Sequence, residues 1–122
     1  MDQLNVFGEP LELCCDNPIT GFTRDGFCNH HPMDRGLHTV CAQMTSEFLN
    51  FSKEQGNDLS TPIPEFNFPG LNEGDRWCLC AMRWVEAYEH GKAPKIYLRD
   101  SHQQILDLVE IEILRKYALD LN

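Results

Sequence analysis

The chain has few basic residues and no long apolar run. Its 122 residues include 10 Lys and Arg against 19 Asp and Glu, which gives a formal net charge of −9. Binding to nucleic acid requires a cationic surface that neutralises phosphates, and an anionic membrane surface makes the same demand. Since no cluster of Lys and Arg supplies such a surface, we expect neither nucleic acid nor a membrane as a partner.

Targeting signals are also missing. No stretch approaches the roughly eighteen apolar residues that a membrane-spanning helix requires. The first ten residues have neither the basic start nor the apolar centre of a secretory signal peptide. We therefore expect a cytoplasmic protein. In that reducing compartment, six cysteines indicate buried thiols, a metal site or redox chemistry rather than disulfides.

Several motifs that carry chemistry do not occur in this sequence. There is no phosphate-binding loop, no Gly-x-Ser-x-Gly, no His-Glu-x-x-His and no EF-hand calcium loop. No two cysteines are separated by the two to four residues that zinc fingers and ribbons use. No cofactor is therefore predicted, and the sequence leaves open whether the chain is an enzyme.

Short runs of apolar residues predict the regular structure. We expect strands over residues 37–44, 77–81 and 95–98, and helices over 46–55, 82–90, 103–108 and 111–118. Thr45 is a suitable N-cap for the first helix and Gly56 a suitable end. In the second helix, Trp84 and Tyr88 are expected to face inward. Ser101 is a possible cap for the third helix.

Long segments rich in Gly and Pro, residues 15–36 and 56–74, separate these elements. Loops of such length in a compact domain are usually functional or unusually well fastened. The elements are short and irregularly spaced, which favours α+β over a regular βαβ series. The expected fold is therefore one compact α+β domain over residues 1–122, with a small sheet, three to four short helices and two long Gly/Pro-rich loops.

Glycine-flanked polar turns are the first candidate site. Glycine allows tight turns and close approach of the backbone to a ligand. Three such turns could line a pocket for a small polar or anionic molecule, with the two arginines contacting an anion. The plainer alternative is that these residues fasten the loops by hydrogen bonds. The candidate ligand-binding residues are Arg24, Asp25, Asn57, Asp58, Asp75 and Arg76.

The cysteines are the second candidate site. Cys78 and Cys80 stand two apart on a predicted strand, so their side chains would share one face, and Cys41 is a plausible cross-strand neighbour. The pair could be nucleophilic, metal-binding or redox-active, or simply buried. A nucleophilic thiol would need a base such as His38 within reach. These three residues, Cys78, Cys80 and His38, are the catalytic candidates.

Cys14, Cys15 and Cys28 lie in or directly before the first long loop, and Cys41 lies on the predicted strand before the first helix. Cys14, Cys28 and Cys41 are the candidate metal ligands, but their spacing argues against a zinc module. No metal site is predicted, and buried thiols are the default interpretation.

These motifs resemble the family called domain of unknown function 2237, which is mainly bacterial. The resemblance covers nearly the whole chain, and it implies a free-standing domain without implying an activity. Family members often carry Cys where Phe27 stands, so a metal site of two adjacent thiols is not expected here. They often carry Ala-Thr where this chain has Asp100-Ser101. The most specific matching run is residues 74–80, and the resemblance also rests on residues 20–22, 24–26, 36–41, 56–62 and 68–71.

Three hypotheses follow for the function. The first is a small-ligand-binding domain or enzyme whose pocket lies between the polar turns, near the Cys-x-Cys pair. The second is a non-catalytic structural or partner-binding domain with buried cysteines. The third is a metal or redox protein that uses its cysteines. We rank the first narrowly ahead of the second.

Overall fold

The computed structural model describes residues 3–121. Two antiparallel strands, β1 (Val40–Gln43) and β2 (Arg76–Leu79), form one small sheet in which Cys41 lies opposite Cys78. Three helices and several 3-10 turns accompany the sheet, so the expected compact α+β fold is confirmed. β1 begins later than predicted because Leu37 has a φ of 52°, a left-handed conformation that a strand does not contain.

The first helix, α1 (Ser46–Glu54), begins as the sequence predicted. The Thr45 hydroxyl accepts a hydrogen bond from the backbone N–H of Phe48 at 3.0 Å. This bond satisfies one of the N–H groups that the first helical turn leaves without a partner. Gly56, with a φ of 91°, follows the end of the helix and turns the chain away.

The other two helices meet through aromatic rings. α2 (Ala81–Glu89) buries Trp84, whose indole N–H donates to the carbonyl of Pro94 at 3.1 Å. The Trp84 ring stacks on Tyr88, and Tyr117 of α3 (Ile111–Tyr117) packs edge-on against both. The inward positions predicted for Trp84 and Tyr88 are confirmed, and this aromatic cluster joins α3 to α2.

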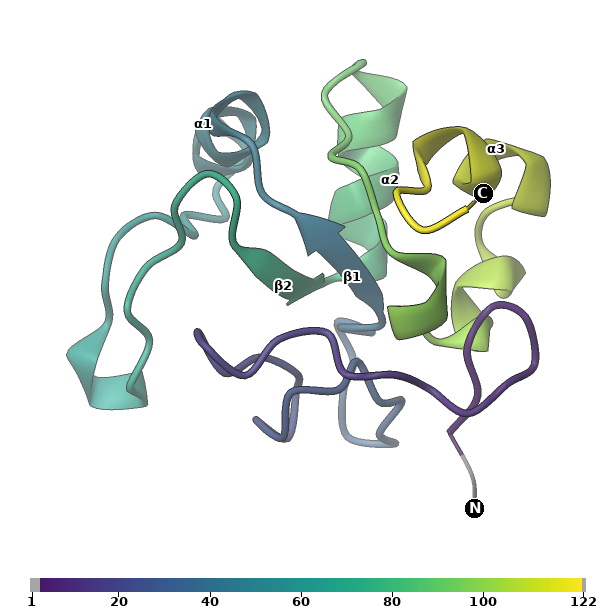
Figure 1. Ribbon diagram of the computed structural model, residues 1–122. Helices are drawn as coiled ribbons and strands as arrows, with labels where there is room; N and C mark the ends of the chain where they lie inside the picture. Colours follow the sequence, from purple (N-terminus) through teal and green to yellow (C-terminus); the bar gives the residue numbers. More distant parts are fainter. Residues whose placement is uncertain (1–2, 122) are drawn as a thin grey trace.

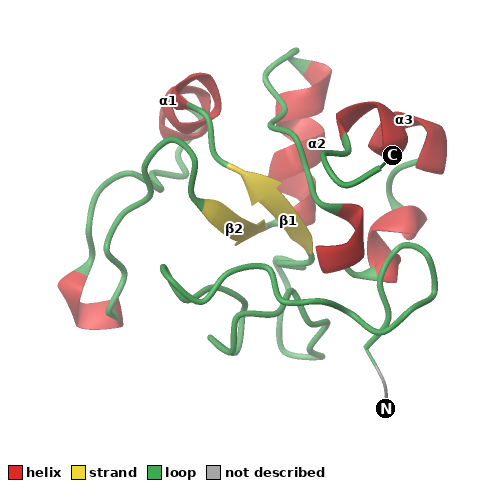
Figure 2. Ribbon diagram, viewed as in Figure 1, coloured by secondary structure: helices red, strands yellow, loops and turns green. Residues whose placement is uncertain are grey.

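The strands separate two parts of the molecule. In Figure 1 the three helices lie above and behind the strands, whereas most of residues 3–39 lies below them. Figure 2 shows that this N-terminal part consists of loop without helix or strand. The main apolar core lies with the helices, and a second, smaller core of four cysteines lies where the N-terminal part meets the strands.

The third predicted strand, residues 95–98, is not formed. Ile96 makes only isolated bridges to Ala42 and Ala118, although Tyr97 N–H donates to the Cys41 carbonyl at 2.9 Å. The chain then turns into a 3-10 helix, η2 (Leu98–Asp100). This turn is held by the Asp120 carboxylate, which accepts from the N–H groups of Leu98 and Arg99. Because these N–H groups bond to the Asp120 side chain instead of to a neighbouring strand, the extended segment ends at Tyr97.

The helix predicted over 103–108 is a 3-10 helix, η3 (Gln103–Asp107), and its cap is His102 rather than Ser101. His102 Nδ1 accepts from the N–H of Gln104 at 3.0 Å. Ser101 is engaged elsewhere: its hydroxyl accepts from the N–H of Cys41 and donates to the carbonyl of Tyr97. Ser101 therefore supports β1 instead of starting a helix.

The second long loop, residues 56–74, contains a further short 3-10 helix, η1 (Pro64–Phe66), between bridged Ile63 and Phe68. Within residues 3–121, no helix has both the length and the apolar character needed to cross a membrane.

Candidate functional site

His38 and Asp34 form a close pair at the end of the first long loop. The Asp34 carboxylate is buried, and its Oδ1 lies 2.7 Å from His38 Nδ1. Its Oδ2 accepts from the backbone N–H of His38 at 2.8 Å. A carboxylate is an acceptor only, so it favours the tautomer with the proton on Nδ1 and the lone pair on Nε2. The pair is thus built like the His–Asp part of a general-base device.

Gly36 makes room for this imidazole. A Cβ added at Gly36 would lie 2.8 Å from Cε1 of His38 and 3.3 Å from Nδ1. The ring therefore rests against the glycine backbone, while Phe22 lies over it with ring centroids 6.4 Å apart. The side chain of His38 remains 39% exposed, so its far edge can be reached from outside.

A pocket of about 260 Å³ opens beside His38. Its polar lining comes from both long loops and comprises Arg24, His38, Asn57 and Asp58. Its apolar lining comes from the second loop and from β2 and comprises Leu59, Ile63, Phe66, Phe68 and Trp77. The predicted convergence of polar turns is therefore present for two of the three turns.

Arg24 reaches the pocket across the face of Trp77. Its guanidinium carbon lies 5.0 Å from the centre of the Trp77 ring, a cation–π distance. One guanidinium N–H, on Nη1, donates to the carbonyl of Gly21 at 2.8 Å. The other N–H groups can meet an anionic group of a ligand, since a guanidinium carries five donors.

Asp58 supplies the negative charge of the pocket. Its Oδ2 accepts from the Thr61 hydroxyl at 2.6 Å, and its Oδ1 accepts from the N–H groups of Ser60 and Thr61. The Thr61 hydroxyl and then the Ser60 N–H hold the pKa of this carboxyl below its usual value. Asp58 thus stays ionised at neutral pH and also fastens its own loop.

The backbone of Asn57 is fixed by one residue, Ser52. Its N–H donates to the carbonyl of Ser52, and its carbonyl accepts from the Ser52 hydroxyl at 2.7 Å. Asn57 and Asp58 are therefore presented from the end of α1 by a well-tied turn.

Asp25 does not line this pocket. Its carboxylate accepts from the N–H of Phe27 and from the side-chain amide of Asn29, so it fastens the first loop. Asp75 likewise accepts from the N–H of Asn72 and closes a turn. These two carboxylates fasten their own turns and lie outside the lining of the pocket.

Arg76 is also outside the pocket, because successive residues of a strand point to opposite faces. Trp77 of β2 faces the pocket, so Arg76 faces away from it. Its guanidinium carbon lies 4.0 Å from the ring centre of Tyr97, and Nη1 lies 3.6 Å from the Asp100 carboxylate. Burial, and then the nearby Asp120, raise the pKa of Asp100 to about 6, and Arg76 only partly opposes them.

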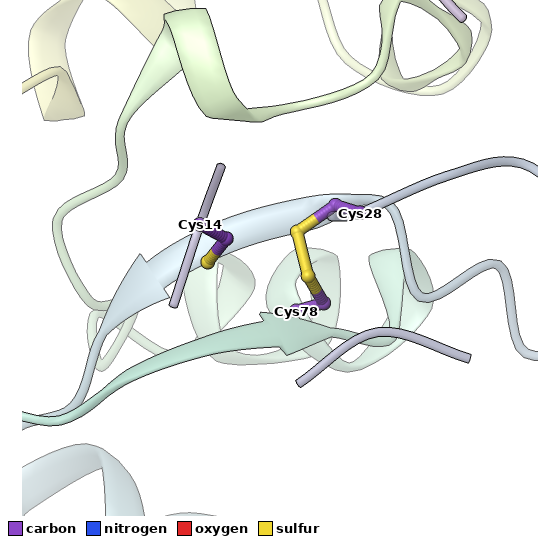
Figure 3. Close-up of side chains that lie close together, drawn as sticks. All are labelled: Cys14, Cys28 and Cys78. Carbon is purple, nitrogen blue, oxygen red and sulfur yellow. A yellow bond between two sulfur atoms is a disulfide. The ribbon is translucent and has the colours of Figure 1, made fainter. Parts of the chain in front are cut away.

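Four of the six cysteines are buried together as disulfides, Cys14–Cys41 and Cys28–Cys78. Figure 3 shows the bonded sulfurs of Cys28 and Cys78 close to Cys14, beside the strands. The expected burial is confirmed, whereas the expected reduced state is not found in the structure. Sequence spacing could not show this, because the pairs form only when the first loop folds across β1 and β2.

Cys78 and Cys80 do not form a pair. β2 ends at Leu79, and Cys80 is the residue before α2, where it is partly exposed. Cys80 lines a separate hollow with Met82, Arg83 and Glu86, whereas Cys78 has no free thiol. The prediction that Cys41 neighbours Cys78 is confirmed by their opposed positions in the sheet.

Sequence reasoning overlooked Asp34, Phe68 and Trp77. Asp34 stands four residues before His38, and Gly36 lies between them. This spacing could have predicted a turn that places the Asp34 carboxylate next to the His38 imidazole. Phe68 and Trp77, whose rings meet edge-on at 5.3 Å, looked like ordinary core residues.

These features define a class of protein: an α+β domain with a pocket lined mainly by its loops, in which disulfides join the N-terminal part of the chain to both strands. The chain belongs to the family described as "Uncharacterized protein conserved in bacteria (DUF2237)", whose model matches residues 4–118. A search of curated proteins found no match. The family resemblance read from the sequence is thereby confirmed.

Proposed function

We propose that this domain binds a small polar molecule that carries an anionic group and an apolar or aromatic body. The observation that carries the proposal is the convergence of Arg24, His38, Asn57 and Asp58 around one pocket walled by Trp77. These residues come from separate loops, and a fastening role alone gives no reason for them to share a cavity.

The residues that line the pocket support this choice of ligand. Arg24 can hold a carboxylate or phosphate, and Asp58 can accept a hydrogen bond from a hydroxyl or ammonium group. The Trp77 and Phe68 rings, which meet edge-on, offer an apolar wall. At about 260 Å³ the pocket is slightly smaller than the roughly 300–1,000 Å³ of sites for drug-sized ligands. This size favours a compact metabolite over a dinucleotide.

Backbone conformation supports the same location. Arg24 and Leu37, which precedes His38, both have positive φ values, 57° and 52°. Non-glycine residues in this region cost of order 1–3 kcal/mol and cluster at functional sites. Here they place the guanidinium and the imidazole at the rim of one pocket.

The His38–Asp34 contact favours an enzymatic version of this proposal. Nε2 would accept a proton from a bound ligand or from a water, and Asp34 would stabilise the resulting imidazolium. A cysteine nucleophile has less support, because Cys78 is buried outside the pocket lining and Cys80 lines a different hollow.

Titration with phenyl phosphate and benzoate tests the binding proposal, with benzyl alcohol as the uncharged comparison. Both anions should shift the NMR signals of the Trp77 indole and raise the melting temperature. Arg24→Gln should weaken binding roughly 10- to 100-fold, the value of a charge-assisted hydrogen bond. Arg115→Gln, which changes an exposed arginine of α3, is the matched control. Equal binding by the two variants would contradict the proposal.

We keep the cytoplasm as the proposed compartment. There the four clustered cysteines would be reduced, whereas an oxidising compartment would preserve the disulfides. Acid quenching of cells, followed by alkylation and mass measurement of the chain, decides between the two states. Protection of these four thiols from alkylation would place the protein in an oxidising compartment.

A further inference from the structure

The four clustered cysteines place their sulfur atoms within a small volume. The Sγ atoms of Cys14, Cys28 and Cys78 all lie within 4.8 Å of one another (Figure 3). Cys41 is bonded to Cys14, so its sulfur belongs to the same group. The four residues form a cluster of their own, separate from the main apolar core.

We propose that the reduced chain binds one Zn²⁺ ion through the thiolates of Cys14, Cys28, Cys41 and Cys78, and that the two disulfides are the oxidised form of this site. The proposal is independent of the ligand pocket described above.

The four cysteine thiolates favour Zn²⁺ over harder metal ions. Four thiolates are soft ligands that suit Zn²⁺ in a tetrahedral site, whereas Mg²⁺ and Ca²⁺ require oxygen. A Zn–S bond of about 2.3 Å places tetrahedral sulfurs about 3.8 Å apart. Three of the sulfurs already lie within 4.8 Å, so small side-chain rotations suffice once the disulfides open.

The positions of the ligands do not depend on the disulfides alone. The N–H of Cys41 donates to the Ser101 hydroxyl at 2.9 Å, and the N–H of Cys78 donates to the Thr20 hydroxyl at 2.8 Å. The N–H of Cys14 donates to the Gly26 carbonyl at 2.8 Å. These hydrogen bonds do not involve sulfur, so reduction leaves them available to hold the thiols together.

Burial makes the site a closed one. None of the four cysteines is more than 3% exposed, so no coordination position is open to water or substrate. Structural zinc sites have this closed arrangement, whereas catalytic sites keep one position open. The ion would therefore do what the disulfides do, namely fasten the first loop to both strands.

The absence of zinc-module spacing does not contradict this site. That spacing places two ligands in one short turn. Here Cys41 and Cys78 are brought together by cross-strand pairing, and the loop that crosses the strands adds Cys14 and Cys28.

A dithiol reductant can convert the disulfide form into the zinc-binding form. Two dithiol molecules are oxidised to cyclic disulfides and give four electrons and four protons to the two protein disulfides. Four protein thiols result. Zn²⁺ then replaces the four thiol protons, which pass to the solvent.

The experiment uses the full chain with Cys15→Ser and Cys80→Ser, which removes the two thiols outside the cluster. The protein is reduced with dithiothreitol, freed of reductant under anaerobic conditions, and titrated with Zn²⁺ or Co²⁺. We expect about one equivalent of Zn²⁺ and, with Co²⁺, the thiolate charge-transfer and intense visible bands of a tetrahedral site. Mg²⁺ should give no response.

Single serine variants then identify the ligands. Replacing Cys14, Cys28, Cys41 or Cys78 in the same background should each weaken Zn²⁺ binding at least tenfold, since even outer-shell changes cost 10- to 100-fold. If the reduced chain unfolds without metal, Zn²⁺ should restore its native circular dichroism. Binding of less than about one-tenth of an equivalent, or unchanged affinity in any of the four variants, overturns the proposal.

Discussion

Cys41 and Cys78 lie directly opposite each other on β1 and β2, and each is bonded to a different cysteine of the N-terminal part of the chain. Cys41 is linked to Cys14, and Cys78 to Cys28. The segment between Cys14 and Cys28 is therefore fixed to both strands. Arg24 lies within that segment, so the disulfides also keep its guanidinium over Trp77 at the pocket.

Removal of either disulfide should lower the free energy of unfolding. The sequence separations are 27 residues for Cys14–Cys41 and 50 for Cys28–Cys78. Loop-closure entropy gives losses of about 3.6 and about 4.1 kcal/mol for the corresponding double serine variants. Urea unfolding without reductant measures both. Cys15→Ser with Cys80→Ser is the control and should change stability by no more than about 0.5 kcal/mol. A similarly small loss in either disulfide variant would show that the bond does not form.

Asp34→Asn should reverse the tautomer of His38. An Asn amide N–H₂ placed near Nδ1 would donate to it, and the ring proton would move to Nε2. Loss of the buried carboxylate should also cost about 1–3 kcal/mol of stability. Nitrogen NMR of the imidazole reads the tautomer directly. Asp25→Asn, which alters a loop-fastening carboxylate outside the pocket, should leave the His38 signals unchanged.

What the sequence predicted well depends on local interactions. The Thr45 cap of α1 needs only a hydroxyl three residues before Phe48, and the inward face of α2 follows from the spacing of Trp84 and Tyr88. Such features are decided within one or two helical turns, so a single sequence contains the necessary information.

The site residues were only partly predictable because their positions depend on long-range pairing. Arg24 and Asp58 carried a usable signal, as polar residues in glycine-containing turns. Arg76 carried the same signal, but strand alternation turns it toward Asp100 and away from the pocket. The disulfide partners of Cys41 and Cys78 depend on how the loop crosses the sheet, which no local pattern specifies.

Titration of Asp100 should lower the free energy of unfolding as pH rises, which is the opposite of the usual effect of a carboxyl group. Its pKa in the folded protein is about 6, raised mainly by burial from an ordinary value of 3.8. Between these values the folded state binds more protons than the unfolded state, so stability falls as pH rises. The effect is at most about 3 kcal/mol.

Urea unfolding of wild type and Asp100→Asn at pH 3.5 to 7.5 isolates this effect. The stability of the variant relative to wild type should increase as pH rises from about 4 to about 6 and then level off. Asp107→Asn, at an exposed position of η3, is the control. Parallel curves for wild type and Asp100→Asn would show that Asp100 titrates normally.

Gly36→Ala should disrupt the His38–Asp34 pair, whereas an alanine at a glycine far from the pair should not. The added methyl would lie 2.8 Å from Cε1 of His38, so the imidazole has to move and its 2.7 Å contact with Asp34 should be lost. Gly74→Ala is the matched control, because Gly74 has a φ of +94° and nothing lies within 4 Å of its added Cβ. That control should cost about 1–2 kcal/mol through backbone strain without moving His38. Both variants should therefore lose stability in urea unfolding, but only Gly36→Ala, which leaves the buried Asp34 carboxylate without its imidazole partner, should shift the His38 signals in imidazole NMR. Unchanged His38 signals in Gly36→Ala would show that the imidazole is not held against this glycine.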